Sequence, residues 1–117
     1  MEHRKISVEE LEVIRAWLDH DVYGAKKLRS QLSTELEVFA SCGCRCPSIG
    51  FVHPDATDSP GVDIFDVDAE IVDAAGTSVG GMVLFTKAGR LHDVDIHSWF
   101  DELPFPALWQ IRWHPRP

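Results

Sequence analysis

One stretch decides the fold of this chain: Val79-Gly-Gly-Met-Val-Leu-Phe-Thr-Lys-Ala-Gly-Arg-Leu-His-Asp-Val-Asp-Ile-His-Ser98. Its first part, 79–86, is mostly apolar, and its last part, 91–98, alternates apolar with polar residues. Alternation with a period of two is typical of a β-strand that buries one face. The four residues 87–90 between them include a glycine, which suits the positive φ of a tight connection. The stretch therefore predicts a β-hairpin.

Three further strands are predicted before this hairpin. In the segment 36–46 the even-numbered residues are apolar or cysteine, and charged residues stand only at odd positions, which again indicates a half-buried strand. A second strand is expected over 49–52, and a third begins at Ile64 or Val67 and ends at Val72. Residues 54–62 are rich in proline, glycine and aspartate and are expected to form a loop.

The N-terminal third of the chain predicts two helices. Ser7 and Glu10 have the spacing of a capping box, in which each side chain bonds the other residue's backbone amide. The first helix should end near Asp19 or His20, and a second is expected from about Ala25 to Ser33. The residues expected on the buried face of the first helix are Val8, Leu11, Ile14 and Leu18.

Helices followed by antiparallel strands favour an α+β domain. The 117 residues have room for one domain, which we expect to span 1–117, with 1–6 and 114–117 frayed. The expected architecture is two N-terminal helices packed on one face of a meandering, mostly antiparallel sheet of about five strands.

Acidic residues are concentrated in one part of the sequence. The chain has 11 Lys and Arg against 19 Asp and Glu, a formal charge of −8, and the whole excess lies in 35–117. Such a surface repels phosphate backbones, so a basic protein is a better expected partner than a nucleic acid. No membrane association is expected, because the longest apolar run, 82–85, is far shorter than the roughly 20 residues that a spanning helix needs.

Two of the predicted strands carry acidic residues on one face. The residues are Asp66, Asp68 and Glu70 in one strand and Asp93, Asp95 and His97 in the other. If both sets point away from the helices, they form an open acidic surface. The preferred function is therefore non-catalytic recognition of a protein through this surface. The alternative is a small enzyme in which Asp93 or Asp95 orients His97 as a general base.

Three cysteines alternate in the segment Cys42-Gly-Cys44-Arg-Cys46. An odd number of cysteines cannot all be paired in disulfides within the chain. Together with the lack of an export signal, this favours the reducing cytoplasm as the location. They are candidate zinc ligands together with His53. Alternate residues of a flat strand stand about 6–7 Å apart, too far for tetrahedral coordination, so zinc binding requires that Gly43 and Pro47 curl the segment. Packing in the core is preferred, so no cofactor is expected unless zinc binds. A redox role, in which Arg45 lowers the pKa of a thiol, is a third interpretation.

The C-terminal segment is rich in aromatic residues, among them Trp99, Trp109 and Trp113. Trp109 and Trp113 alternate with Ile111, which is typical of an edge strand or an apolar strip. The segment is expected to cover the core of its own domain. The alternative is a self-association or partner-binding site, because tryptophan is enriched at interface hot spots.

Three motifs resemble those of a group of small uncharacterised bacterial proteins. They are Cys42-x-Cys44-x-Cys46-Pro47, Val79-Gly80-Gly81-Met-Val-Leu-Phe and Gly89-Arg-Leu91-x-x-Val94-Asp95-Ile96-x-x-Trp99. The last motif is also weakly similar to sequences of toxin-neutralising immunity proteins. The resemblance implies one autonomous domain, and it implies no activity and no functional residue.

Overall fold

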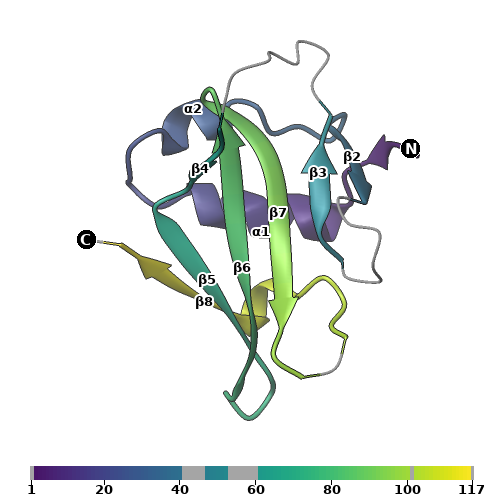
Figure 1. The fold of residues 1–117 in the computed structure, drawn as a ribbon, viewed down its shortest axis with the longest axis vertical. Coiled ribbons are helices and arrows are strands. Elements are labelled where there is room, and N and C mark those ends of the chain that lie inside the picture. The colour runs from purple at the N-terminus through teal and green to yellow at the C-terminus, as the bar shows by residue number, and fades with distance from the viewer. Residues whose placement is uncertain (1, 41–46, 53–60, 101, 117) are drawn as a thin grey trace.

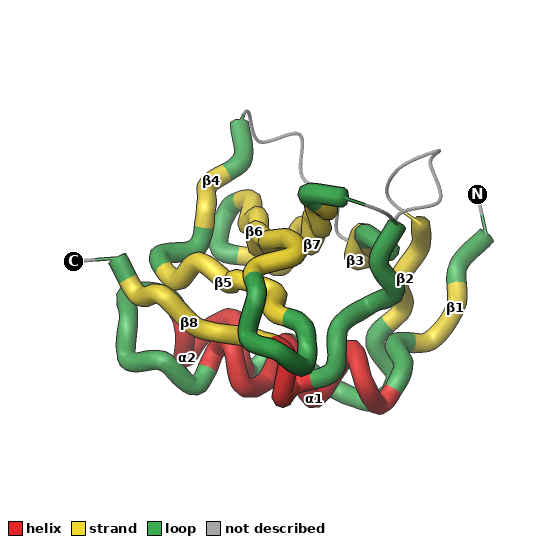
Figure 2. Tube along the Cα trace, turned by 90° about the horizontal axis from the view of Figure 1, so that it is seen from below, coloured by secondary structure: helices red, strands yellow, loops and turns green. Residues whose placement is uncertain are grey.

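The computed structural model describes residues 2–40, 47–52, 61–100 and 102–116. Within them, helices α1 (Val8–Leu18) and α2 (Ala25–Arg29) lie on one side of a single antiparallel sheet, as Figure 1 and Figure 2 show. The predicted α+β class is confirmed. The predicted number of strands was too low, because the sheet has eight.

The strands follow the order β1-β2-β3-β7-β6-β5-β8, and β4 pairs with β6 beside this path. The strands β1 and β4 have two residues each, too few for alternation to be recognised, whereas β8 forms where the alternation of Trp109, Ile111 and Trp113 allowed an edge strand. The elements are β1 (Arg4–Lys5), β2 (Glu37–Ala40), β3 (Ile49–Phe51), β4 (Asp63–Ile64), β5 (Val67–Val72), β6 (Ser78–Lys87), β7 (Arg90–Ser98), the 3-10 helix η1 (Leu108–Gln110) and β8 (Ile111–Pro115).

The predicted hairpin is formed by β6 and β7, which pair from Gly80 with Ser98 to Lys87 with Arg90. The connection is therefore two residues long rather than four. Ala88 and Gly89 fill it with φ angles of 52° and 75°. Positive φ at both central residues is the signature of a type I′ turn, whose twist matches that of the two strands.

The core lies between the helices and the sheet. Trp17 is completely buried, and its Nε1 donates a hydrogen bond of 2.7 Å to the carbonyl of Val67. This bond satisfies the indole N–H and fixes α1 against β5. The inward-facing strand residues are Val67, Ala69 and Ile71 on β5, Met82 and Leu84 on β6, and Leu91, Val94 and Ile96 on β7.

The first helix buries a different face from the one predicted. Leu11, Ile14 and Leu18 are buried as expected, but Val8 is 73% exposed. At about 100° per residue, Val8 lies about 120° around the helix from Ile14, which points it away from the sheet. Glu10, Val13 and Trp17 complete the buried face instead.

The predicted capping box of Ser7 and Glu10 is present, with bonds of 2.8 and 3.1 Å. Arg4 adds two bonds of 2.8 and 2.7 Å from its guanidinium to the Glu10 carboxylate, which is almost fully buried. Burial alone raises the pKa of the Glu10 carboxyl, but the bonds from Arg4 and Ser7 outweigh it and lower the pKa. This network holds the N-terminal strand on the start of α1.

Both ends of the described chain are paired, where the sequence predicts fraying. Ile6 is buried and donates its N–H to the Leu36 carbonyl at 2.7 Å, directly after β1. At the other end Arg116 donates its N–H to the Asp66 carbonyl at 2.8 Å, directly after β8. These pairing partners are distant in sequence, so no local sequence pattern predicts the pairing.

Glu10→Ala should lower the free energy of unfolding by about 1–3 kcal/mol, because Arg4 and the Ser7 amide lose their acceptor. Glu9→Ala is the matched control, since Glu9 is exposed in the same helical turn, and its effect should stay within about 0.5 kcal/mol. Urea unfolding at neutral pH measures both. Equal losses for the two variants would contradict the role assigned to Glu10.

Ala88→Gly should stabilise the protein by up to about 1 kcal/mol, because glycine adopts positive φ without the steric cost that alanine carries. Ala75→Gly is the control, since Ala75 also lies in an exposed turn but has no positive φ. That change should destabilise slightly through chain entropy. Thermal unfolding should therefore shift in opposite directions for the two variants.

Candidate binding surface

The candidate site is the face of the sheet that points away from α1 and α2, which we call the outer face. Figure 2 shows both helices on the opposite side of the strands. The acids of β5 and β7 alternate with the buried core residues, so their side chains point to this outer face. The acids brought to this face are Asp68, Glu70, Asp93 and Asp95.

The register places these residues in rows across the three central strands. Glu70 lies opposite Gly81 of β6, and Gly81 lies opposite His97 of β7. In the neighbouring rows Val83 faces Asp95 and Phe85 faces Asp93. The outer face therefore has a small and apolar centre on β6, with acidic strands on both sides.

Asp66 does not join this surface. It lies at a bend between β4 and β5, outside the paired strand residues, although burial still alternates from Phe65 to Glu70. Its side chain lines a cavity together with Lys27 and Tyr23 near α2. The predicted row of three acids on one strand is therefore reduced to Asp68 and Glu70.

Every acid of the outer face has a basic neighbour, so the surface is mixed rather than uniformly acidic. These pairs contain two arginines and four carboxylates, so the paired groups together are negative while the histidines are neutral. The pairs are Glu70 with His114 at 3.1 Å and with Arg112 at 3.9 Å, Asp68 with Arg116 at 3.6 Å, Asp95 with His97 at 3.3 Å, and Asp93 with His92 at 3.0 Å.

The basic neighbours of β5 come from β8, and the sequence did not point to them. Arg112 and His114 alternate with the inward-facing Ile111 and Trp113, and the register sets them opposite Glu70 and Asp68. Opposite charges at facing positions of two strands stabilise the pairing. The alternation of residues 111–114 was the available signal, but it does not say which strand β8 joins.

Trp99 lies on the outer face over Gly81. A Cβ atom added to Gly81 would stand 3.5 Å from the indole ring, so the ring packs directly on this glycine. The indole Nε1 donates to the Ser78 hydroxyl at 3.1 Å. Trp99 is nevertheless 56% exposed.

Glu70 accepts bonds at the centre of this network. Hydrogen bonds from His114 and from Ser78 lower the pKa of the Glu70 carboxyl below its ordinary value. Partial burial acts in the opposite direction and is the weaker influence. Glu70 therefore stays ionised beside Trp99 at neutral pH.

The structure separates the three tryptophans that the sequence grouped together. Trp109 is 67% exposed on η1. Trp113 faces inward, with its ring centroid 5.5 Å from those of Trp17 and His20. Of the three, Trp113 therefore covers the protein's own core, whereas Trp99 belongs to the outer face.

His97 has one of the two alternative aspartate partners that the enzyme hypothesis allows. Its Nε2 lies 3.3 Å from Asp95, but Asp93 pairs with His92 instead. His97 is half-exposed, and it lines none of the three cavities found near α2 and the β6–β7 turn. Within the described residues, the side chains of His97 and Asp95 are 50% and 39% exposed, and neither lines one of these three cavities.

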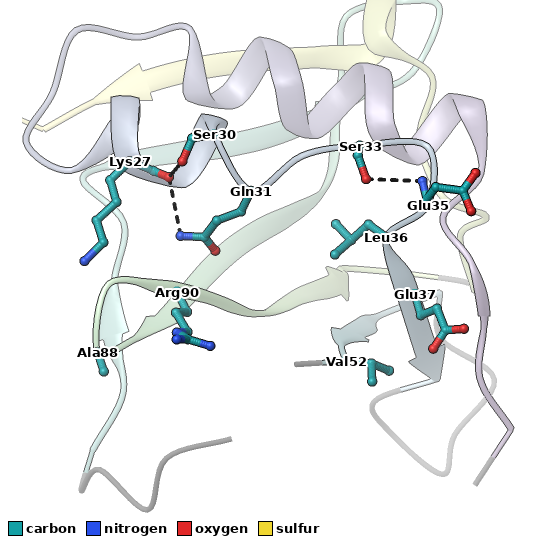
Figure 3. Close-up of a pocket in the computed structure, with 10 residues that line it drawn as sticks. All are labelled: Lys27, Ser30, Gln31, Ser33, Glu35, Leu36, Glu37, Val52, Ala88 and Arg90. Atoms are coloured by element: carbon teal, nitrogen blue, oxygen red, sulfur yellow. Dashed lines mark hydrogen bonds between the residues drawn. The ribbon is translucent and has the colours of Figure 1, made fainter. Parts of the chain in front are cut away.

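One of these cavities is an open groove of about 770 Å³ between the end of α2 and the start of β7, shown in Figure 3. Gln31 closes its inner end, because its side-chain amide donates to the Gly89 carbonyl and accepts from the Leu91 N–H, at 2.9 and 3.0 Å. Lys27 and Glu35 line the same groove. The Gln31 side chain thus bonds the backbone groups of Gly89 and Leu91 in the way that the backbone of a neighbouring strand would.

The candidate zinc ligands Cys42, Cys44, Cys46 and His53 lie outside the described residues. Among the residues that are described, no three His, Cys, Asp or Glu side chains are grouped to hold a metal ion. In the same part of the chain, no helix has the length and apolar character needed to cross a membrane.

Comparison of the chain with family models, with curated proteins and with solved structures finds no match. The resemblance to small bacterial proteins therefore stays a prediction. Function has to be argued from the outer face itself.

The Glu70 carboxyl should titrate below the ordinary pKa of glutamate, and His114→Ala should raise its midpoint because the strongest bond to the carboxylate is lost. His97→Ala is the control, since His97 pairs with Asp95. Carbonyl NMR from pH 2 to 7 measures the midpoints. The stabilisation from Glu70 is complete above the unfolded-state pKa and is lost as the pH falls through the folded-state value. An unchanged midpoint in His114→Ala would contradict this assignment.

Proposed function

We propose that this protein is a non-catalytic recognition domain that binds a basic protein segment through its outer face. The observation that carries the proposal is the exposed Trp99 on Gly81, set among carboxylates on the side of the sheet opposite the helices. Protein interfaces are typically built this way, with an aromatic centre and a polar, charged rim.

Charge supports the choice of a basic partner. The whole chain carries a formal charge of −8, and the ion pairs described above join four carboxylates of the outer face to two arginines and three histidines. Long-range attraction of a basic segment would raise the rate of association, and the same field disfavours nucleic acid. The histidine pairs leave the surface negative as long as the histidines are neutral.

Exposure of the acids supports direct contact with a partner. The side chains of Asp68 and Asp95 are 50% and 39% exposed although both are paired. Their ion-pair partners, Arg116 and His97, are 41% and 50% exposed, and exposed ion pairs contribute little to stability. Asp95 also accepts a hydrogen bond of 3.3 Å from the buried Ser48 hydroxyl through its other oxygen. A basic side chain from a partner could therefore share or replace them at small cost to the fold.

Two other functions stay open as outcomes of experiment. Zinc binding by Cys42, Cys44 and Cys46 with His53 predicts about one zinc per chain in elemental analysis of protein purified without an affinity tag. Self-association predicts a concentration-dependent mass in sedimentation, although two copies of the acidic outer face would repel each other.

Asp93→Asn/Asp95→Asn should weaken binding of a hexaarginine peptide at least about fivefold, because it removes two charges from the outer face. Glu12→Gln/Asp21→Asn is the matched control, since it removes the same charge from exposed positions on and after α1 and should change affinity less than twofold. Calorimetry at low and high salt measures both. Equal weakening in the two variants would mean that only net charge matters and would refute a site on the outer face.

A further inference from the structure

We propose that the exposed face of Trp99 is the anchoring subsite of the outer face and that it takes an arginine side chain of the partner. The guanidinium would stack on the indole, with Glu70 on one side and Asp95 on the other. This inference rests on the proposed function and names the residue type that the surface selects.

The Trp99 ring is held in place before any partner arrives. Its backbone N–H bonds the Val79 carbonyl at 3.0 Å, and its indole N–H bonds the Ser78 hydroxyl at 3.1 Å. Its ring atoms Cζ2 and Cη2 would stand 3.5 and 3.6 Å from a Cβ at Gly81, and the residue is still 56% exposed. An aromatic ring that is already oriented loses little entropy on binding, which favours affinity.

Gly81 provides the space for this ring. It has no positive φ, so its backbone does not require a glycine. A Cβ there would be in ordinary contact with the ring at 3.5 and 3.6 Å, but any longer side chain would occupy the ring's position. A glycine inside a strand weakens the strand unless something packs closely on it, and here that is Trp99.

The carboxylates next to the ring favour a cation. Glu70 and His97 are the cross-strand neighbours of Gly81, and Asp95 lies two residues before His97 on the same face. At the usual strand spacing of about 4.8 Å and about 7 Å between alternate residues, both carboxylates are within about 10 Å of the ring. A cation on the indole is attracted by the ring and by both charges.

Arginine fits this arrangement better than lysine. Its planar guanidinium stacks on an aromatic face and can donate to a carboxylate from its edge at the same time. The ammonium of lysine is a compact and strongly hydrated charge that gains less from stacking. The subsite should therefore distinguish the two basic residues.

The test compares hexaarginine, hexalysine and uncharged hexacitrulline peptides on the full chain. Trp99→Ala should weaken hexaarginine binding about 5- to 30-fold, the range expected for a cation–π contact. Trp109→Ala is the matched control, because Trp109 is 67% exposed on η1, and it should change affinity less than twofold. Ser78→Ala keeps the ring but removes its hydrogen bond, and an intermediate loss is expected.

NMR of the four tryptophan indole N–H groups locates the peptide directly. Hexaarginine should shift the Trp99 signal, while the buried Trp17 signal and the Trp109 signal stay in place. Hexalysine should bind more weakly than hexaarginine, and hexacitrulline should not bind.

Each contrary result has a separate meaning. If Asp93→Asn/Asp95→Asn weakens binding and Trp99→Ala does not, the anchor is refuted and the recognition surface stands. Equal affinity for hexalysine refutes the preference for arginine, and equal affinity for hexacitrulline refutes a cation site. If no basic peptide binds, both the anchor and the proposed function are refuted.

Discussion

The structure depends on how little of the sheet the helices can cover. The two helices have 11 and 5 residues, so they cover only one side of an eight-stranded sheet. The covered side takes the apolar half of every central strand, and Trp17 fixes the layers together through its bond to Val67. The other side must then be made of residues that tolerate water. The open acidic and aromatic face thus follows from how the core is built.

The C-terminal strand changes the character of that open face. By pairing with β5, β8 places Arg112 and His114 beside Glu70 and Asp68. A chain with a formal charge of −8 therefore presents ion pairs on its outer face and not a plain acidic patch. Because exposed pairs are weakly held, a partner's charges can compete for them, which suits reversible recognition.

Trp99 links the two halves of this surface. Its indole, directly after β7, bonds Ser78 of β6 and packs on Gly81, whose cross-strand neighbour Glu70 on β5 pairs with His114 of β8. The ring is exposed, oriented and next to ionised carboxylates. This combination distinguishes Trp99 from Trp109, which is equally open but lies on η1, and from Trp113, which packs on Trp17.

Local order was determined by the sequence alone: the capping box of Ser7 and Glu10, the strands around 79–98 and the buried side of β5, β6 and β7 follow from spacing within a few residues. Only the tertiary structure decided that Asp66 leaves the acidic row, that β8 supplies the basic partners and that Trp99 lies on Gly81. These facts depend on a bend and on strand pairings between distant segments. Alternation says which way a side chain points from its own strand, but it carries no information about which strand lies beside it.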